Sequence, residues 1–120
     1  MTFYQCKNSK EIFISENKLV PDYEVMVELL PNTTDAAGEK HVPVIKDTGG
    51  LVEVTVGSVE HPMLAAHYIM WIVLETTKGW QKKDLVPGEK PKAVFALTED
   101  EKAVAAYEYC NLHGLWKADA

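Results

Sequence analysis

A cysteine and a histidine near the end of the chain form its most chemically distinctive stretch. Cys110 and His113 stand in the segment Cys-Asn-Leu-His-Gly-Leu-Trp, which ends at Trp116. A thiolate and an imidazole three residues apart can bind the same metal ion, because both are common ligands of transition metals. The pair therefore predicts part of a metal site that other residues must complete.

The remaining histidines could complete this site. A single histidine is more often a surface or hydrogen-bonded residue than a ligand, and a single cysteine is more often a small buried apolar residue. The grouping carries more weight than its members, because all four histidines and one of the two cysteines fall in the second part of the chain. The candidate ligands of one metal ion are therefore His41, His61, His67, Cys110 and His113.

The donor set bears on the identity of the metal. Structural zinc uses four ligands in a tetrahedron, so four imidazoles and a thiolate are one donor too many. A blue-copper site uses two histidines, a cysteine and a weak axial methionine, for which Met63 is available, so copper stays open. Iron suits five protein ligands, because an axial thiolate pushes electron density toward an open position opposite to it. Iron is the favoured expectation.

The composition excludes several classes of function. The chain has 120 residues, 47% of them apolar, and a net charge of −6 with no basic cluster, so we expect no nucleic-acid partner. No apolar run approaches the roughly 20 residues that cross a bilayer, and no secretory signal is present, so we expect a cytoplasmic protein without a membrane partner. An anionic substrate would need a local positive charge to draw it in.

Strand signals dominate the whole chain. Residues 1–37 predict a small β module with strands near 3–6, 11–14 and 23–30, and a connector rich in Pro, Asn, Thr and Gly follows. Residues 38–120 predict a second domain with strands at 41–45, 51–56, 68–77 and 93–97, divided by turns. The fold class expected is therefore all-β, with a β-sandwich as the larger domain.

Residues 98–109 give a divided local signal. Thr98 and Glu101 form a capping box, and the alanine-rich stretch after it favours a helix. Tyr107, Glu108 and Tyr109 alternate as strand residues do. Local propensity alone does not decide between the two.

Three segments resemble the signature segments of the desulfoferrodoxin and neelaredoxin superoxide reductases. They are Glu-Lys-His-Val-Pro-Val at residues 39–44, His-Pro-Met with His-Tyr-Ile at residues 61–69, and residues 110–116. The resemblance covers most of residues 32–117 in the family's order and spacing. It implies an immunoglobulin-like β-sandwich with one mononuclear iron per chain, held by four equatorial histidines and an axial cysteine. It also favours a strand over residues 103–109.

The resemblance assigns roles to the pair that precedes the first histidine. In the family, the glutamate that corresponds to Glu39 can occupy the sixth position of oxidised iron, and the lysine that corresponds to Lys40 attracts and orients superoxide. The residue types fit these roles, because Lys40 is a flexible positive charge next to a candidate ligand. Glu39 and Lys40 are therefore the expected catalytic residues.

The first module resembles a degenerate desulforedoxin-like segment. Cys6 matches its first cysteine, but Ser9, Pro21 and Asp22 stand where the other cysteines would be. A tetrathiolate iron site cannot form from Cys6 alone. We therefore expect a module without metal, which the resemblance links to assembly of a homodimer.

The function expected from the resemblance is superoxide reduction. One electron and two protons convert superoxide to hydrogen peroxide, and an external donor such as rubredoxin reduces the iron again. The alternative is a non-catalytic electron-transfer metalloprotein, either with iron or with copper in a cupredoxin-like site.

Overall fold

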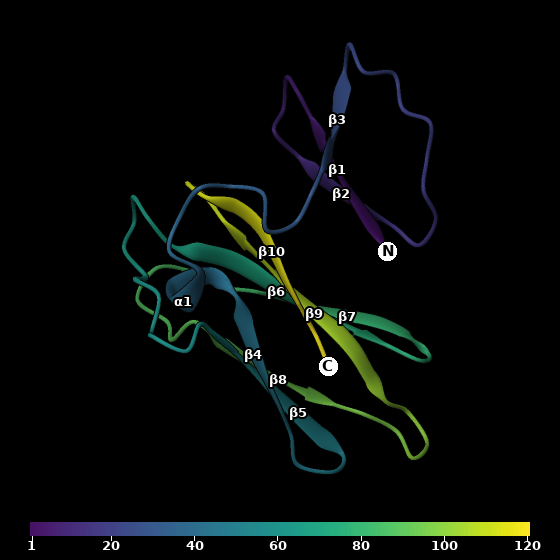
Figure 1. The fold of residues 1–120 in the computed structure, drawn as a ribbon, viewed down its shortest axis with the longest axis vertical. Coiled ribbons are helices and arrows are strands. Elements are labelled where there is room, and N and C mark those ends of the chain that lie inside the picture. Colours follow the sequence, from purple (N-terminus) through teal and green to yellow (C-terminus); the bar gives the residue numbers. More distant parts are fainter. The chain divides into compact units, whose positions relative to one another are not determined.

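The computed structural model describes all residues from Met1 to Ala120. Its contacts divide the chain into two compact units, Met1–Leu30 and Pro31–Ala120. Strands form nearly all of the regular structure, which confirms the all-β prediction (Figure 1). The single helix spans four residues, far too few to cross a membrane. The sequence-based boundary after residue 37 remains a prediction.

The first unit is a three-stranded antiparallel sheet in the order β2-β1-β3. Its strands are β1 (Thr2–Cys6), β2 (Ile12–Ser15) and β3 (Met26–Leu29). The third strand is shorter than the sequence predicts, because the Asp22 carbonyl accepts the N–H groups of Val25 and Met26 in a turn. Cys6 has no second cysteine beside it, so the unit contains no tetrathiolate site.

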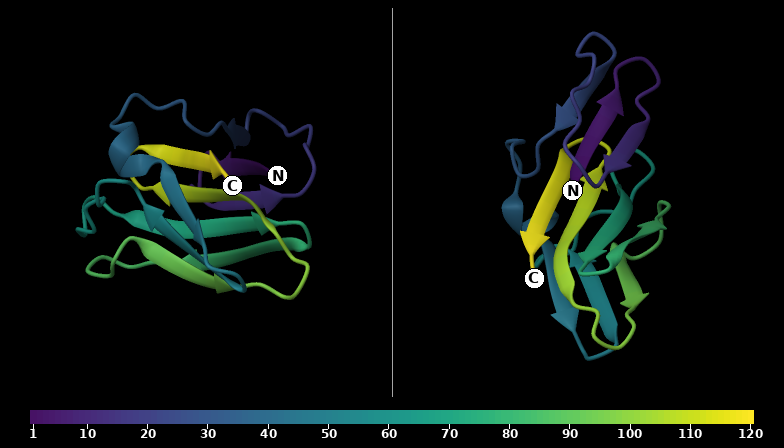
Figure 2. Two further views of the ribbon diagram at one scale, coloured as in Figure 1. Left: turned by 60° about the horizontal axis from the view of Figure 1, so that its bottom comes forward. Right: turned by 90° about the vertical axis from the view of Figure 1, so that its right-hand side faces the viewer.

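The second unit packs two antiparallel sheets into a β-sandwich, as the sequence predicts (Figure 2). One sheet has the order β10-β9-β6-β7 and the other β4-β5-β8. The elements are α1 (Gly38–His41), β4 (Pro43–Asp47), β5 (Leu51–Val56), β6 (Ile69–Thr76), β7 (Gly79–Asp84), β8 (Lys92–Ala96), β9 (Ala103–Cys110) and β10 (Gly114–Asp119). The sequence pattern did not predict β7 or β10.

The core lies between the two sheets. β5 alternates as predicted, with Val52, Val54 and Val56 buried. Burial of such apolar surface is worth about 25 cal/mol per Å² and is the main stabilising term of the sandwich. The core cluster comprises Val52, Val54, Val56, Ile69, Ile72, Leu74, Leu85, Ala93, Phe95, Ala106 and Cys110. Since Cys110 belongs to this cluster, the candidate thiolate ligand is held by the packed core of the unit.

His41 does not lie in a strand, so the strand predicted at residues 41–45 is wrong at its start. His41 is the last residue of the helical turn α1, and β4 begins only at Pro43. Proline has no N–H to donate to a ladder, so it is suited to the start of an edge strand, and β4 is an edge strand. The turn directs the His41 side chain inward, where it is buried.

Residues 103–110 form strand β9, so the resemblance predicted this segment correctly and the helix propensity did not. β9 pairs with β6 on one side and β10 on the other. Only half of the capping box is formed: the Glu101 carboxylate accepts the Thr98 N–H at 3.0 Å, but the Glu101 N–H donates to the Thr98 carbonyl at 3.1 Å and not to its side chain. These bonds close a tight turn, and pairing on both edges then outweighs the alanine helix propensity.

Candidate metal centre

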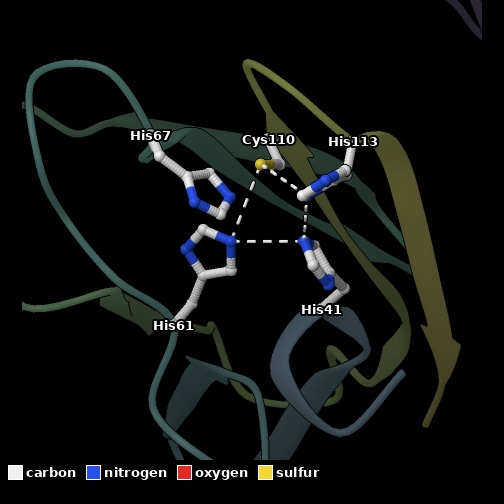
Figure 3. A group of neighbouring side chains, drawn as sticks. All are labelled: His41, His61, His67, Cys110 and His113. Atoms are coloured by element: carbon white, nitrogen blue, oxygen red, sulfur yellow. Dashed lines mark hydrogen bonds between the residues drawn. The ribbon is translucent and has the colours of Figure 1, made fainter. Parts of the chain in front are cut away.

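Four imidazoles and one thiol converge at one end of the sandwich (Figure 3). One ligand atom from each side chain lies within 4.8 Å of all the others. Each residue comes from a different place in the chain: the end of α1, the loop after β5, the segment before β6, the end of β9 and the turn that follows β9. The structure thus brings together every residue predicted as a ligand: His41, His61, His67, Cys110 and His113.

Two of the rings have a defined tautomer. The Nδ1 atom of His41 lies 2.7 Å from the Ala37 carbonyl, and that of His61 lies 2.6 Å from the Pro62 carbonyl. A carbonyl oxygen only accepts, so each Nδ1 carries the proton. The Nε2 atom of each neutral ring then has a free lone pair, and these two Nε2 atoms lie 3.2 Å apart.

This close approach suits a cation bound between the two nitrogens. Two neutral rings that face each other through lone pairs repel, because neither can donate a hydrogen bond to the other. A proton on either Nε2 atom would relieve this repulsion. Burial disfavours such protonation, because it lowers the pKa of His61 to about 4 and also lowers the pKa of His41. A metal ion would accept both lone pairs, and neutral imidazoles are the form that binds metals. The donor set therefore fits a metal ion.

The other two rings present different nitrogens. The Nδ1 atom of His113 lies 3.1 Å from Nε2 of His41 and 4.0 Å from the sulfur of Cys110, so His113 faces the site through Nδ1. The Nε2 atom of His67 is buried without any hydrogen-bond partner. Buried polar atoms are nearly always paired, so this nitrogen fits a ligand atom.

The four imidazole rings surround the site, and each ring lies next to two others. Neighbouring ring centroids in the order His41, His61, His67 and His113 are 4.6 to 5.0 Å apart, and neighbouring planes meet at 73° to 87°. The protein supplies five donor atoms in all, so an octahedral ion bound here would keep one position without a protein ligand.

The thiol is buried beside the rings. The sulfur of Cys110 lies 3.6 Å from Nε2 of His61. Burial raises the pKa of the Cys110 thiol, while the backbone N–H groups of Leu112 and His113 donate to the sulfur and oppose that rise. A bound metal ion would favour the thiolate outright, since a coordinating thiol is deprotonated.

Trp116 positions two of the histidines, a role that the sequence did not reveal. Its ring stacks on His41 with centroids 4.9 Å apart and planes at 26°. Its indole N–H donates to the His113 carbonyl at 3.0 Å. Residues that hold ligands in this way often matter nearly as much as the ligands themselves. The only sequence signal was a large aromatic residue close after His113.

Asn111 ties the segment that carries His67 to the end of β9. Its side-chain oxygen accepts the Tyr68 N–H at 3.0 Å, and its side-chain nitrogen donates to the Ala66 carbonyl at 3.1 Å. The amide therefore holds the residues on both sides of His67 in place. This role depends on two segments that are far apart in sequence, so no local pattern could have predicted it.

Gly57 supports the turn that carries His41. A Cβ atom at Gly57 would lie 2.6 Å from the Glu39 carbonyl oxygen and 3.0 Å from the Lys40 carbonyl carbon. The Val59 N–H donates to the same Glu39 oxygen at 2.9 Å. Only glycine allows this approach, so the loop after β5 fixes the position of α1.

Glu39 and Lys40 lie on α1 directly before His41, and both side chains are exposed. Burial is the main cause that lowers the pKa of His67, but the positive charge of Lys40 contributes to the same shift. Lys40 also lines a surface depression together with His61. Both residues thus stand at the rim of the site, and their catalytic roles stay predictions.

A sequence model of the desulfoferrodoxin family matches residues 33–119, which is most of the chain and contains all five candidate ligands. The chain belongs to the desulfoferrodoxin family. It is 48% identical over 96 residues to the desulfoferrodoxin of Clostridium acetobutylicum, covering 80% of this chain and 74% of that protein. It is 50% identical over 97 residues to the desulfoferrodoxin of Nitratidesulfovibrio vulgaris, covering 81% and 75%.

Solved structures agree with this assignment. The superoxide reductase of Treponema pallidum covers 98% of this desulfoferrodoxin-family chain with a TM-score of 0.81 and 39% identity, and 98% of that protein is matched. The superoxide reductase of Giardia intestinalis has a TM-score of 0.59 and 35% identity, covering 68% of this chain and 97% of that one. The family resemblance predicted from the three segments is therefore confirmed.

Proposed function

We propose that this chain is a superoxide reductase that converts superoxide to hydrogen peroxide at one mononuclear iron. The observation that carries the proposal is the centre itself, in which four imidazole lone pairs and a thiol converge on one point. Five protein donors leave one position for a small oxygen species, which a closed tetrahedral zinc site would not. Membership of the desulfoferrodoxin family supports the same assignment.

Iron in this donor set would supply the electron and an open position for superoxide. The protein would hold the iron through Nε2 of His41, His61 and His67, Nδ1 of His113 and the Cys110 sulfur. Superoxide gains one electron and two protons to become hydrogen peroxide. Each residue that holds a ligand, including Trp116, keeps the site in one geometry during this exchange.

Lys40 and Glu39 act at the rim of the site in this proposal. The Lys40 ammonium offers positive charge and donors that attract the superoxide anion and hold water for proton delivery. The Glu39 carbonyl is fixed by the Val59 N–H, while its side chain is exposed. The family resemblance implies that Glu39 would be the residue that supplies a further ligand to the oxidised iron.

The copper alternative loses its axial ligand. The Met63 sulfur accepts the Ile69 N–H at 3.3 Å, and its side chain packs against the core cluster. A blue-copper site needs only two histidines, a cysteine and a weak axial ligand, whereas four histidines converge here. Iron accounts for the whole donor set.

An external donor must return the electron, and we propose a rubredoxin-type protein. Leu112 stands between the ligands Cys110 and His113 and is 60% exposed. A donor protein could therefore contact the turn that carries the two ligands at Leu112. We further propose a homodimer in the cytoplasm, which sedimentation and fractionation would test.

The deciding experiment measures metal, spectrum and product together. We expect one iron per chain and a thiolate-to-iron absorption band that Cys110→Ser abolishes. Superoxide generated by pulse radiolysis should then yield one hydrogen peroxide per superoxide without dioxygen. A protein that releases dioxygen, or that does not consume superoxide when reduced and loaded with iron, would contradict the proposal.

A further inference from the structure

An open depression of about 590 Å³ lies beside the candidate metal centre. One wall is formed by the ligand His61 and the two residues after it, and another by the loop between β7 and β8. Its lining includes four charged side chains: Lys40, Glu60, Glu89 and Lys90.

The loop that carries Lys90 is fixed to the wall of the site. The Gly88 N–H donates to the Met63 carbonyl at 2.9 Å, and the Glu89 N–H donates to the Val86 carbonyl at 3.2 Å. The Lys92 N–H donates to the Lys90 carbonyl at 2.8 Å. The backbone at Lys90 is therefore held next to the segment that follows His61.

The charges in the depression are not equally available to an anion. The Glu89 carboxylate accepts the Val86 N–H at 2.9 Å and so stabilises its own loop. Neither Lys40 nor Lys90 forms an ion pair, whereas Lys92, two residues beyond Lys90, pairs with Glu53 at 3.6 Å. Lys90 is thus an unpaired positive charge at the approach to the site of a protein whose net charge is −6.

We propose that Lys90 is a second positioning residue, which acts with Lys40 to draw superoxide along this depression, and that Glu60 opposes them. The inference rests on the proposed function, since it concerns the approach of that substrate. Charges that line a cleft raise the local concentration of an oppositely charged ligand, and this effect is strongest near the reacting centre.

Three variants with the same size of charge change test the proposal. In Lys90→Gln, the second-order rate constant for superoxide at low ionic strength should fall about twofold, and in Glu60→Gln it should rise about twofold. Lys92→Gln alters the net charge as Lys90→Gln does, but removes a charge already paired with Glu53, so its rate should stay near that of the wild type. Raising the salt should bring all rates together, because ions screen exposed charges.

A second readout avoids turnover. Azide, a small anion that ligates ferric iron, should bind more weakly to oxidised Lys90→Gln and more tightly to Glu60→Gln, with iron content unchanged in every variant. Equal rates for Lys90→Gln and Lys92→Gln, or rate differences that persist at high salt, would overturn the role of Lys90. Wild-type protein that does not react with superoxide at all would instead overturn the proposed function.

Discussion

The Nε2 atoms of His41 and His61 lie 3.2 Å apart, and each ring has already committed its Nδ1 proton to a backbone carbonyl. Two lone pairs therefore face each other in the buried end of a β-sandwich. The Ala37 and Pro62 carbonyls that orient the rings also prevent them from donating to one another. The fold thus builds a place for a cation before any cation binds, and burial keeps the His61 ring neutral by lowering its pKa to about 4.

Metal binding should release about one proton per chain near neutral pH. The pKa of His61 is lowered to about 4, so its ring is already neutral and has no proton to lose. Burial raises the pKa of the Cys110 thiol, so the thiol must lose its proton to become a ligand. Calorimetry of ferrous iron binding in buffers of different ionisation enthalpy measures the number of protons released. Cys110→Ser should lower it toward zero, and an unchanged value in that variant would contradict the assignment.

Replacement of Lys40 by alanine should slow the reaction with superoxide and leave the iron content intact. The side chain is exposed, and none of the five donor atoms belongs to it. The loss of local positive charge should lower the rate constant about tenfold, as expected for a charge next to the reacting centre. Pulse radiolysis and an iron assay check both statements. An unchanged rate would show that Lys40 has no part in the reaction.

Gly57→Ala should loosen the metal site. The new Cβ would meet the Glu39 oxygen at 2.6 Å, so α1 must move and carry His41 with it. We expect the unfolding free energy of the iron-loaded protein to fall by about 2 kcal/mol or more, with weaker retention of iron against a chelator. Gly38→Ala is the matched control, because its Cβ would meet only Val42, at 4.0 Å. Equal iron retention in both variants would exclude this role of Gly57.

Trp116→Phe should keep the ring that stacks on His41 but lose the hydrogen bond to His113. The indole N–H donates to the His113 carbonyl at 3.0 Å, and removal of such a bond costs about 1 kcal/mol. We expect weaker iron affinity and a shifted thiolate-to-iron band, because the turn after Cys110 is less fixed. Trp80→Phe, at a residue 39% exposed, should change neither property. Identical spectra for Trp116→Phe and the wild type would contradict this prediction.

Glu108 predicts a pH dependence of stability. It is fully buried, neither carboxylate oxygen has a partner, and burial raises its pKa well above the ordinary value. The unfolded chain loses this proton near pH 4.3, while the folded chain keeps it to higher pH. The folded state therefore binds more protons above that pH, so its stability falls as pH rises.

Glu108→Gln should remove this dependence. The gain in unfolding free energy over the wild type should grow as the pH rises above about 5, by up to about 1.4 kcal/mol per pH unit. Urea unfolding of the iron-loaded proteins at several pH values measures it, with Glu99→Gln at an exposed position as the control. A difference that does not change with pH would mean that the Glu108 carboxyl has an ordinary pKa.

The sequence by itself determined the class of fold and the candidate ligands. Alternation in residues 51–56 predicted a half-buried strand, and donor chemistry belongs to residue types, so His41, His61, His67, Cys110 and His113 could be named before their positions were known. The spacing of three short segments was enough to indicate the desulfoferrodoxin family.

Only the tertiary structure decided how these residues are held. It determined which nitrogen His41 and His61 present, because the carbonyls of Ala37 and Pro62 accept a hydrogen bond from the other nitrogen. It packed Gly57 against the backbone of α1 and stacked Trp116 on His41. It also folded the alanine-rich segment Ala103–Cys110, which has helix propensity, into strand β9. Each of these outcomes depends on contacts between segments far apart in the chain. Local propensity cannot encode such contacts, because they exist only after the two sheets have packed.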